Sequence, residues 1–214
     1  SSLSADPARE GLIAVLDDLK HNAKDVSIDG AATLLGQWYH PVNYFPEFLS
    51  RLISVSPLIE TQTSICGILW QELGEGDPAA AHTALYVDTM ESAGFARDTV
   101  AGSSPAPYTA ELVDAYRKSS YDPITGLGFL YGTEVADLPM VSAVGHLVRT
   151  CTGKKEFPWV DIHVKQEPDH VKSSSRALLP SFTKEEEARI VGGARELWML
   201  WTGFFQGVKK TILN

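Results

Sequence analysis

The sequence predicts an all-α protein that folds as a single domain of about eight helices. Apolar residues recur at the three- and four-residue spacing of amphipathic helices along most of the chain, and several runs begin at an Asp-Pro pair. No useful stretch alternates between apolar and polar residues as a strand does, and no internal repeat is visible. A length of 214 residues suits one large helical core, so we expect residues 1–214 to form one domain.

The first helices are predicted from capping residues and prolines. Asp6-Pro7 is a typical N-cap and first-turn pair, and the apolar residues behind it recur at helical spacing. Asp29 can cap a short second helix. Pro41 and Pro46 then predict a junction, because proline lacks the backbone N–H that a helix interior needs.

The next two helices are predicted to carry an acid and a histidine close together. Residues 57–73 form one helical run, the glycine-rich segment 74–76 breaks it, and residues 77–94 form the next run. Glu72 lies at the end of the first helix and His82 near the start of the second. Because the break is short, both side chains can reach one site.

A third candidate ligand lies in the middle of the chain. Residues 108–119 predict a helix with a polar face, Asp122-Pro123 caps the next one, and Pro139 is expected to start another. Glu134 stands among glycine and apolar residues of the second of these helices. A carboxylate in such surroundings is costly to bury unless it is paired or bound to a metal.

The segment FPWVDIHVKQEPDHVK, residues 157–172, holds His163, Glu167 and His170. An α-helix turns about 100° per residue, so offsets of four and seven residues return to one face. Two imidazoles and a carboxylate on one face suit a metal such as iron, although a solvated polar face has the same spacing. Pro168 is expected to kink this helix, as often happens at metal-binding helices.

The last helix is expected from residue 183 past residue 209, and its bulky side chains should close the core. Aromatic side chains here and near the two prolines either shape a pocket or belong to the core. They are Trp38, Tyr44, Phe45, Trp198 and Trp201.

Composition excludes several classes of protein. A net charge of −9 without a basic run argues against a nucleic-acid surface. No apolar stretch reaches the roughly 18 residues of a membrane span, and the N-terminus has no signal-peptide pattern. Cys66 and Cys151 are far apart, so we expect two free, buried thiols in a reducing cytoplasm, with a disulfide between them left open.

The order of the acids and imidazoles resembles that of a known family. The motifs are Glu72-Leu-Gly-Glu-Gly-Asp-Pro-Ala-Ala-Ala-His82, then Tyr131-Gly-Thr-Glu134, then His163-x3-Glu167-x2-His170. They resemble the haem-oxygenase-like di-iron oxidases, iron-containing redox enzymes whose superfamily also holds haem oxygenase, the thiaminase-like TenA proteins and PqqC. The ferritin-like bundles are disfavoured because they use two Glu-x-x-His pairs, whereas neither Glu72 nor Glu134 is followed by a histidine at that spacing and only Glu167-Pro-Asp-His170 has it.

The resemblance implies a haem-oxygenase-like helical bundle with two Fe(II) ions and O2 as co-substrate. It implies that one iron takes Glu72, His82 and His170, that the other takes His163 and Glu167, and that Glu134 is shared. The family usually has Asp where this chain has Glu167, so Asp169 is an alternative ligand if the proline shifts the register.

The resemblance also implies an oxidoreductase of a biosynthetic pathway that acts on a small amino-acid-like or carboxylate substrate, by N-oxygenation or oxidative C–C cleavage. Such a substrate needs a cation for its carboxylate. The basic residues considered are Arg117, Arg149, Lys154 and Lys165. We expect no nucleic-acid or membrane partner, and a homodimer is plausible for helical domains of this kind although no heptad seam indicates one.

Other interpretations remain open at this stage. The scaffold could hold a single metal ion, or none, as a helical binding or regulatory protein with solvated acids and histidines. A haem protein would need an axial ligand such as His21. A thiaminase-like enzyme would need a reactive cysteine, but the apolar sequence surroundings of Cys66 and Cys151 are not those of a thiol with a lowered pKa.

Overall fold

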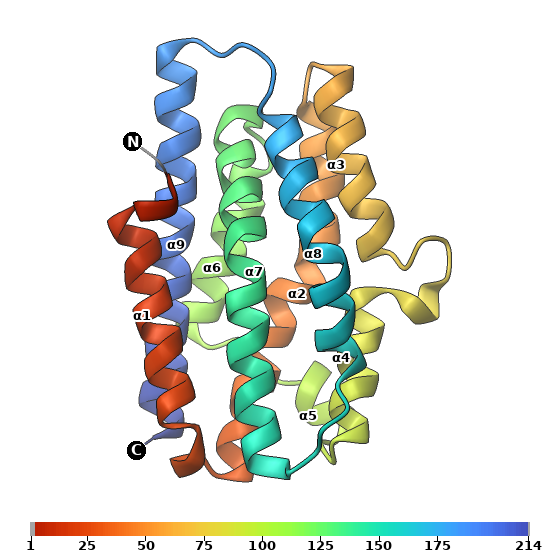
Figure 1. Ribbon diagram of the computed structural model, residues 1–214, viewed down its shortest axis with the longest axis vertical. Helices are drawn as coiled ribbons and strands as arrows, with labels where there is room; N and C mark the ends of the chain where they lie inside the picture. The colour runs from red at the N-terminus through yellow and green to blue at the C-terminus, as the bar shows by residue number, and fades with distance from the viewer. Residues whose placement is uncertain (1–2, 214) are drawn as a thin grey trace.

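Nine α-helices and three short 3₁₀ helices account for the secondary structure of residues 3–213, the part of the chain that the computed structural model describes (Figure 1). No strand occurs in this range, so the predicted all-α class is confirmed. The α-helices are α1 (Pro7–His21), α2 (Ile28–Val55), α3 (Ile59–Glu72), α4 (His82–Ser92), α5 (Arg97–Ala101), α6 (Pro107–Ser119), α7 (Pro123–Thr152), α8 (Pro158–Ala177) and α9 (Lys184–Ile212). The 3₁₀ helices are Leu3–Ala5, Ala23–Asp25 and Pro78–Ala80.

Several helices begin where the sequence predicts because side chains cap their first turns. The carboxylate of Asp6 accepts the N–H of Ala8, and Asp122 accepts the N–H of Ile124. Thr183 and Glu186 form a capping box at the start of α9.

The prolines of α2 and α7 do not end these helices. Pro41 and Pro46 lie inside α2, and Pro139 lies inside α7, so the predicted junction at 41–46 and the predicted new helix at Pro139 were wrong. A proline removes one backbone hydrogen bond from a helix interior. Both helices bury apolar side chains along their length, and this burial offsets the lost hydrogen bonds.

Helix α7 is the centre of the bundle. It packs against α1, α2, α8 and α9, while α3 lies against α8 on the other side of the site (Figure 1). An aromatic cluster of α2 and α9 fills part of the core, in which Trp38 lies 5.1 Å from Trp201 and 5.8 Å from Phe205 between ring centroids. The most extensive helix pair is α7 with α9.

Glycines allow α7 and α9 to approach closely. A Cβ atom at Gly128 would lie 2.2 Å from the carbonyl oxygen of Ile190, and one at Gly193 would lie 2.8 Å from that of Thr125. Neither helix backbone can accept a methyl group there without moving. This contact fixes the position of α7, which carries Glu134.

Replacing Gly128 by Ala is expected to lower the free energy of unfolding by about 2–4 kcal/mol, because a side chain is forced into packed backbone. Gly192 is the matched control: it lies on α9, and a Cβ there meets no atom within 4 Å. Gly192→Ala should instead stabilise the protein by about 0.5–1 kcal/mol through helix propensity. Thermal unfolding of both variants checks the pair, and equal effects would contradict the close approach.

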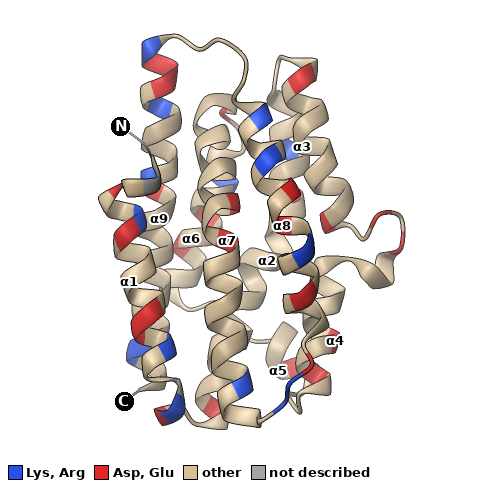
Figure 2. Ribbon diagram, in the orientation of Figure 1, with Lys and Arg blue, Asp and Glu red and all other residues tan. Residues whose placement is uncertain are grey.

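The outer surface carries both signs of charge. The ribbon in Figure 2, coloured by residue type, shows acidic and basic residues interspersed along the helices. None of the described helices is long and apolar enough to cross a membrane. Both cysteines are free thiols, but Cys66 is exposed on α3 and Cys151 is only half-buried, so the prediction that both are buried was wrong.

Candidate metal centre

The structure brings together all six residues that the sequence singles out as metal ligands. Four helices supply them, and each is buried to at least nine-tenths. Glu72 ends α3, His82 begins α4, Glu134 lies on α7, and His163, Glu167 and His170 lie on one face of α8.

A tight loop carries the chain from Glu72 to His82. Gly74 and Gly76 have φ values of 80° and 98°, in the left-handed region that favours glycine. A Cβ atom at Gly74 would lie 2.1 Å from the carbonyl oxygen of Asp77, so only glycine fits there. The 3₁₀ helix Pro78–Ala80 then turns the chain; the single helix predicted from residue 77 to 94 was therefore wrong in its first turn. The result is a distance of 3.1 Å between His82 Nδ1 and Glu72 Oε2.

Two of the imidazoles are oriented by hydrogen bonds from the nitrogen that does not face the cluster. His163 Nδ1 donates to the carbonyl of Trp159 at 2.6 Å. His82 Nε2 lies 2.7 Å from Oε1 of Gln166, leaving Nδ1 toward Glu72. An acceptor on one ring nitrogen places the lone pair on the other, which is the arrangement of a metal-binding histidine.

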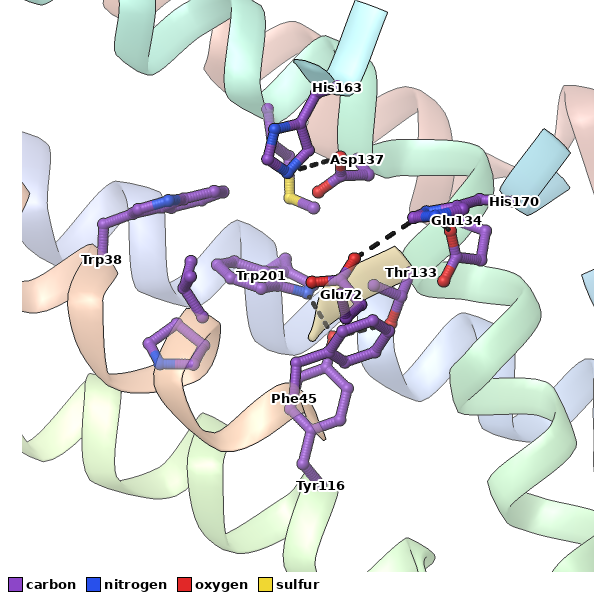
Figure 3. A pocket seen from close by; sticks show the side chains of 13 residues that line it. Trp38, Phe45, Glu72, Tyr116, Thr133, Glu134, Asp137, His163, His170 and Trp201 are labelled. Carbon is purple, nitrogen blue, oxygen red and sulfur yellow. Dashed lines mark hydrogen bonds and ion pairs between the residues drawn. The ribbon is translucent and has the colours of Figure 1, made fainter. Parts of the chain in front are cut away.

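His170 lies between the carboxylates of three helices. Its Nδ1 is 3.3 Å from Glu134 Oε2, 3.8 Å from Glu72 Oε1 and 4.0 Å from Glu167 Oε2. The rings of His82 and His163 are 4.6 Å apart between centroids. Figure 3 shows His163, His170, Glu72 and Glu134 around one space.

Several buried polar atoms of this cluster lack a hydrogen-bond partner among the described residues. Folded proteins pair the great majority of buried polar atoms, so a concentration of unpaired ones needs an explanation. Six such atoms lie here: His82 Nδ1, Glu134 Oε1, Asp137 Oδ2, both Glu167 oxygens and His170 Nε2. Ligand atoms of Glu134, Glu167 and His170 also lie within 4.8 Å of one another. Carboxylate and imidazole donors left without hydrogen bonds around one space fit a metal centre.

Electrostatics show the same lack of positive charge. Burial raises the pKa of Glu134 to about 7. Burial, together with the carboxylates of Asp137 and Glu134, raises the pKa of Glu167 to about 12. Burial lowers the affinity of His170 for a proton, but the hydrogen bond and charge of Glu134 outweigh it and raise its pKa to about 9. Divalent cations would relieve this repulsion.

Sequence reasoning missed one acid at the site. Asp137 lies one helical turn after Glu134 on α7, and its Oδ2 is 3.8 Å from His163 Nε2. The spacing Glu134-x-x-Asp137, which places two acids on one helix face, was the available signal. Asp169, the predicted alternative to Glu167, is exposed. Pro168 therefore does not turn Asp169 toward the site, and Glu167 is the inward residue.

The three other histidines lie away from the cluster. His21 and His146 are exposed, and Nε2 of His40 lies 2.9 Å from the carbonyl oxygen of Ser103. An exposed His21 does not provide the enclosed axial position that the haem interpretation needs.

A small cavity of about 40 Å³ adjoins the cluster (Figure 3). That is room for only a few water-sized molecules. Besides the acids and imidazoles, its wall is mostly apolar and includes Trp38, Phe45, Tyr116, Met140 and Trp201. Of the other predicted aromatic wall residues, Trp198 is buried and donates to the carbonyl of Gly132, and Tyr44 does not line this cavity.

No lysine or arginine is among the described residues that line this cavity. Arg117 pairs with Asp114 on the surface, the guanidinium of Arg149 lies over Phe157, and Lys154 bonds to the carbonyl of Ser92. Lys165 is exposed. The prediction that one of these four residues meets the substrate carboxylate is therefore not supported by the structure.

Residues 32–202 match the model of a family described as iron-containing redox enzymes. The matched range covers most of the chain and includes all six predicted ligands. The chain belongs to this family. The iron named in the family description fits the carboxylate and imidazole donors that converge at this site. The family assignment also supports the general class of oxidoreductases. No curated protein matches the chain.

Solved structures share the fold. A CADD-like protein of unknown function from Nostoc punctiforme superposes with a TM-score of 0.83 at 14% identity, over 94% of this chain and 91% of that chain. A domain of unknown function with a haem-oxygenase-like fold from Shewanella denitrificans superposes with a TM-score of 0.77 at 16% identity, over 95% of this chain and 89% of that chain. A TenA homologue from Pseudomonas syringae superposes with a TM-score of 0.72 at 12% identity, over 95% of this chain and 88% of that chain. The predicted haem-oxygenase-like fold is confirmed.

Gln166 is expected to support metal binding without being a ligand. Its Oε1 forms a hydrogen bond with Nε2 of His82. Loss of such a partner of a metal-binding histidine typically weakens metal affinity by about 10–100-fold. Gln166→Ala should therefore weaken binding of divalent metal by about 10–100-fold. The exposed Gln206→Ala on α9 is the control. Anaerobic titration checks both, and an unchanged affinity for Gln166→Ala would contradict this role.

Proposed function

We propose that this iron-containing redox enzyme is a non-haem di-iron, O2-dependent oxidase or oxygenase. The observation that carries the proposal is the set of buried, unpartnered carboxylate and imidazole atoms around one space. Glu72, His82 and His170 would hold one ion, His163 and Glu167 the other, and Glu134 both. Six protein donors on a single ion would fill an octahedral shell and leave no position for O2, whereas two ions sharing them keep positions open.

The protein's own contribution is to place the substrate and to limit water at the site. Iron bound here would supply the electrons that reduce O2. Trp38, Phe45 and Trp201 exclude water from one side of the cluster. Tyr116 stays a neutral phenol, because burial raises its pKa by more than the hydrogen bonds of its hydroxyl with Thr133 and Trp201 lower it.

The cavity limits the substrate to a small molecule, and we propose an amino-acid-like or other carboxylate compound that undergoes N-oxygenation or oxidative C–C cleavage. Since no lysine or arginine is found in the cavity wall as far as the structure describes the chain, the polar group of the substrate would face the metal ions. The indole N–H of Trp38 is buried without a hydrogen-bond partner and is free to donate to the substrate. Free thiols and Fe(II) suit a reducing compartment, and we propose the cytoplasm.

Anaerobic titration with Fe(II) tests the proposal. Two ions per chain are expected, followed by O2 consumption when air is admitted. His163→Ala should lose at least one ion and the O2 consumption. A protein that takes up no metal, with no change on His163→Ala, would instead be a metal-free binding protein.

A further inference from the structure

We infer that Asp137 is a seventh protein ligand of the metal centre and completes the site of the second ion. This inference rests on the proposed di-iron function. Asp137 extends from α7 toward the ring of His163, which comes from α8 (Figure 3). Its carboxylate is partly exposed, at 19%, but its Oδ2 is buried and has no hydrogen-bond partner.

The position of Asp137 relative to His163 distinguishes a ligand from an outer support. Nδ1 of His163 already donates to Trp159, so Nε2 is the nitrogen left for a metal ion. A supporting carboxylate would bind the nitrogen on the far side of the ring from the ion. Asp137 instead faces Nε2, on the side where the ion would lie.

The distance between the two donors fits one ion. Metal–ligand distances of about 2.1 Å place two donors of the same ion about 3.0–4.2 Å apart, from a right angle to opposite positions. Oδ2 of Asp137 and Nε2 of His163 are 3.8 Å apart. The pair of His82 and Glu72, at 3.1 Å, falls in the same range.

Charge and donor number lead to the same assignment. Glu72, Glu134 and Glu167 carry three negative charges, whereas two divalent ions carry four positive charges. Among the described residues of the cavity wall, Asp137 is the one acid besides Glu72 and Glu134, and no lysine or arginine is present. Net charge in a buried site is costly, so a fourth carboxylate makes the loaded centre neutral.

With Asp137 the two sites also become equivalent in number of donors. The first ion has Glu72, His82 and His170, together with the shared Glu134. Without Asp137 the second ion has only two residues of its own, His163 and Glu167. With Asp137 it has three, so each ion has three residues of its own and one shared carboxylate.

The experiment is anaerobic titration of metal-free wild type, Asp137→Asn and Asp161→Asn with Mn(II), followed by EPR. Asp161 is exposed on α8, and its variant should bind two ions as the wild type does, with the spin-coupled signal of a pair. Asp137→Asn should keep one ion and bind the second at least about 100-fold more weakly, so the uncoupled signal of a single Mn(II) appears.

Thermal unfolding of the metal-free proteins separates a ligand from a structural residue. Removing one of several crowded, buried carboxylates should leave the melting temperature of metal-free Asp137→Asn equal to or above that of the wild type. A clear decrease, or two ions bound with unchanged affinity, would overturn the role of Asp137 while leaving the di-iron proposal in place. Fewer than two ions bound by the wild type would overturn both.

Discussion

Glu134→Gln should lose O2 consumption by at least about 100-fold and bind at most one metal ion tightly. Glu134 is the carboxylate that both ions would share, and it comes from α7 between the ligands of α3 and α8. Glutamine keeps the volume of the side chain but removes its charge, so it cannot bridge two cations. The loss should exceed the 10–100-fold effect typical of residues that only support a ligand.

The matched control for this variant is Glu60→Gln. Glu60 is exposed on α3, the helix that also carries Glu72, and the same chemical change there should leave metal content and O2 uptake as in the wild type. Metal content is measured by elemental analysis after anaerobic loading, and O2 uptake with an electrode. Two tightly bound ions in Glu134→Gln would refute the shared position.

Loading with divalent metal should raise the melting temperature by at least about 10 °C. Each ion present at 100 times its dissociation constant adds about 2.7 kcal/mol, and each kcal/mol raises the melting temperature of a protein of this size by about 2–4 °C. The metal-free protein is the weaker state because burial and neighbouring carboxylates disfavour the ionised forms of Glu134 and Glu167, as their raised pKa values show. Calorimetry with Mn(II) or Fe(II) under nitrogen measures the difference, and Mg(II) is the control because it keeps its water and prefers oxygen donors.

The difference in melting temperature between the metal-loaded and the metal-free protein should grow as the pH rises from 6 to 8. In the metal-free protein the pKa values of Glu134 and His170 are raised to about 7 and about 9 by their surroundings. The folded state therefore holds protons that the unfolded chain has released, and its stability decreases with rising pH across this range. Metal ions replace these protons, so the loaded protein should be less affected. A melting-temperature difference that shrinks between pH 6 and pH 8 would contradict this account.

The ligand helix could be predicted from the sequence because its information is local. His163, Glu167 and His170 recur at helical spacing, and α8 forms around them. Glu72 and His82 could be placed near each other because only a glycine-rich turn separates their helices. For these residues, periodicity and turn chemistry were sufficient.

Other features depend on contacts between distant parts of the chain. The helices α2 and α7 continue through their prolines because neighbouring helices cover them, which no local rule includes. Asp137 resembles any partly exposed acid in the sequence until α8 brings His163 within 3.8 Å. A cation for the substrate could not be chosen from the sequence for the same reason: Arg117 and Arg149 have partners supplied by the tertiary structure.

The close contact between α7 and α9 has a consequence for biosynthesis. Every proposed ligand precedes residue 171, yet α9, which holds α7 in place through Gly128 and Gly193, begins only at Lys184. A chain emerging from the ribosome thus carries all the donor atoms before it has the helix that fixes their positions. Iron would be acquired only after α9 has been synthesised and packed against α7, and a chain cut before α9 would keep each ligand but lose the centre.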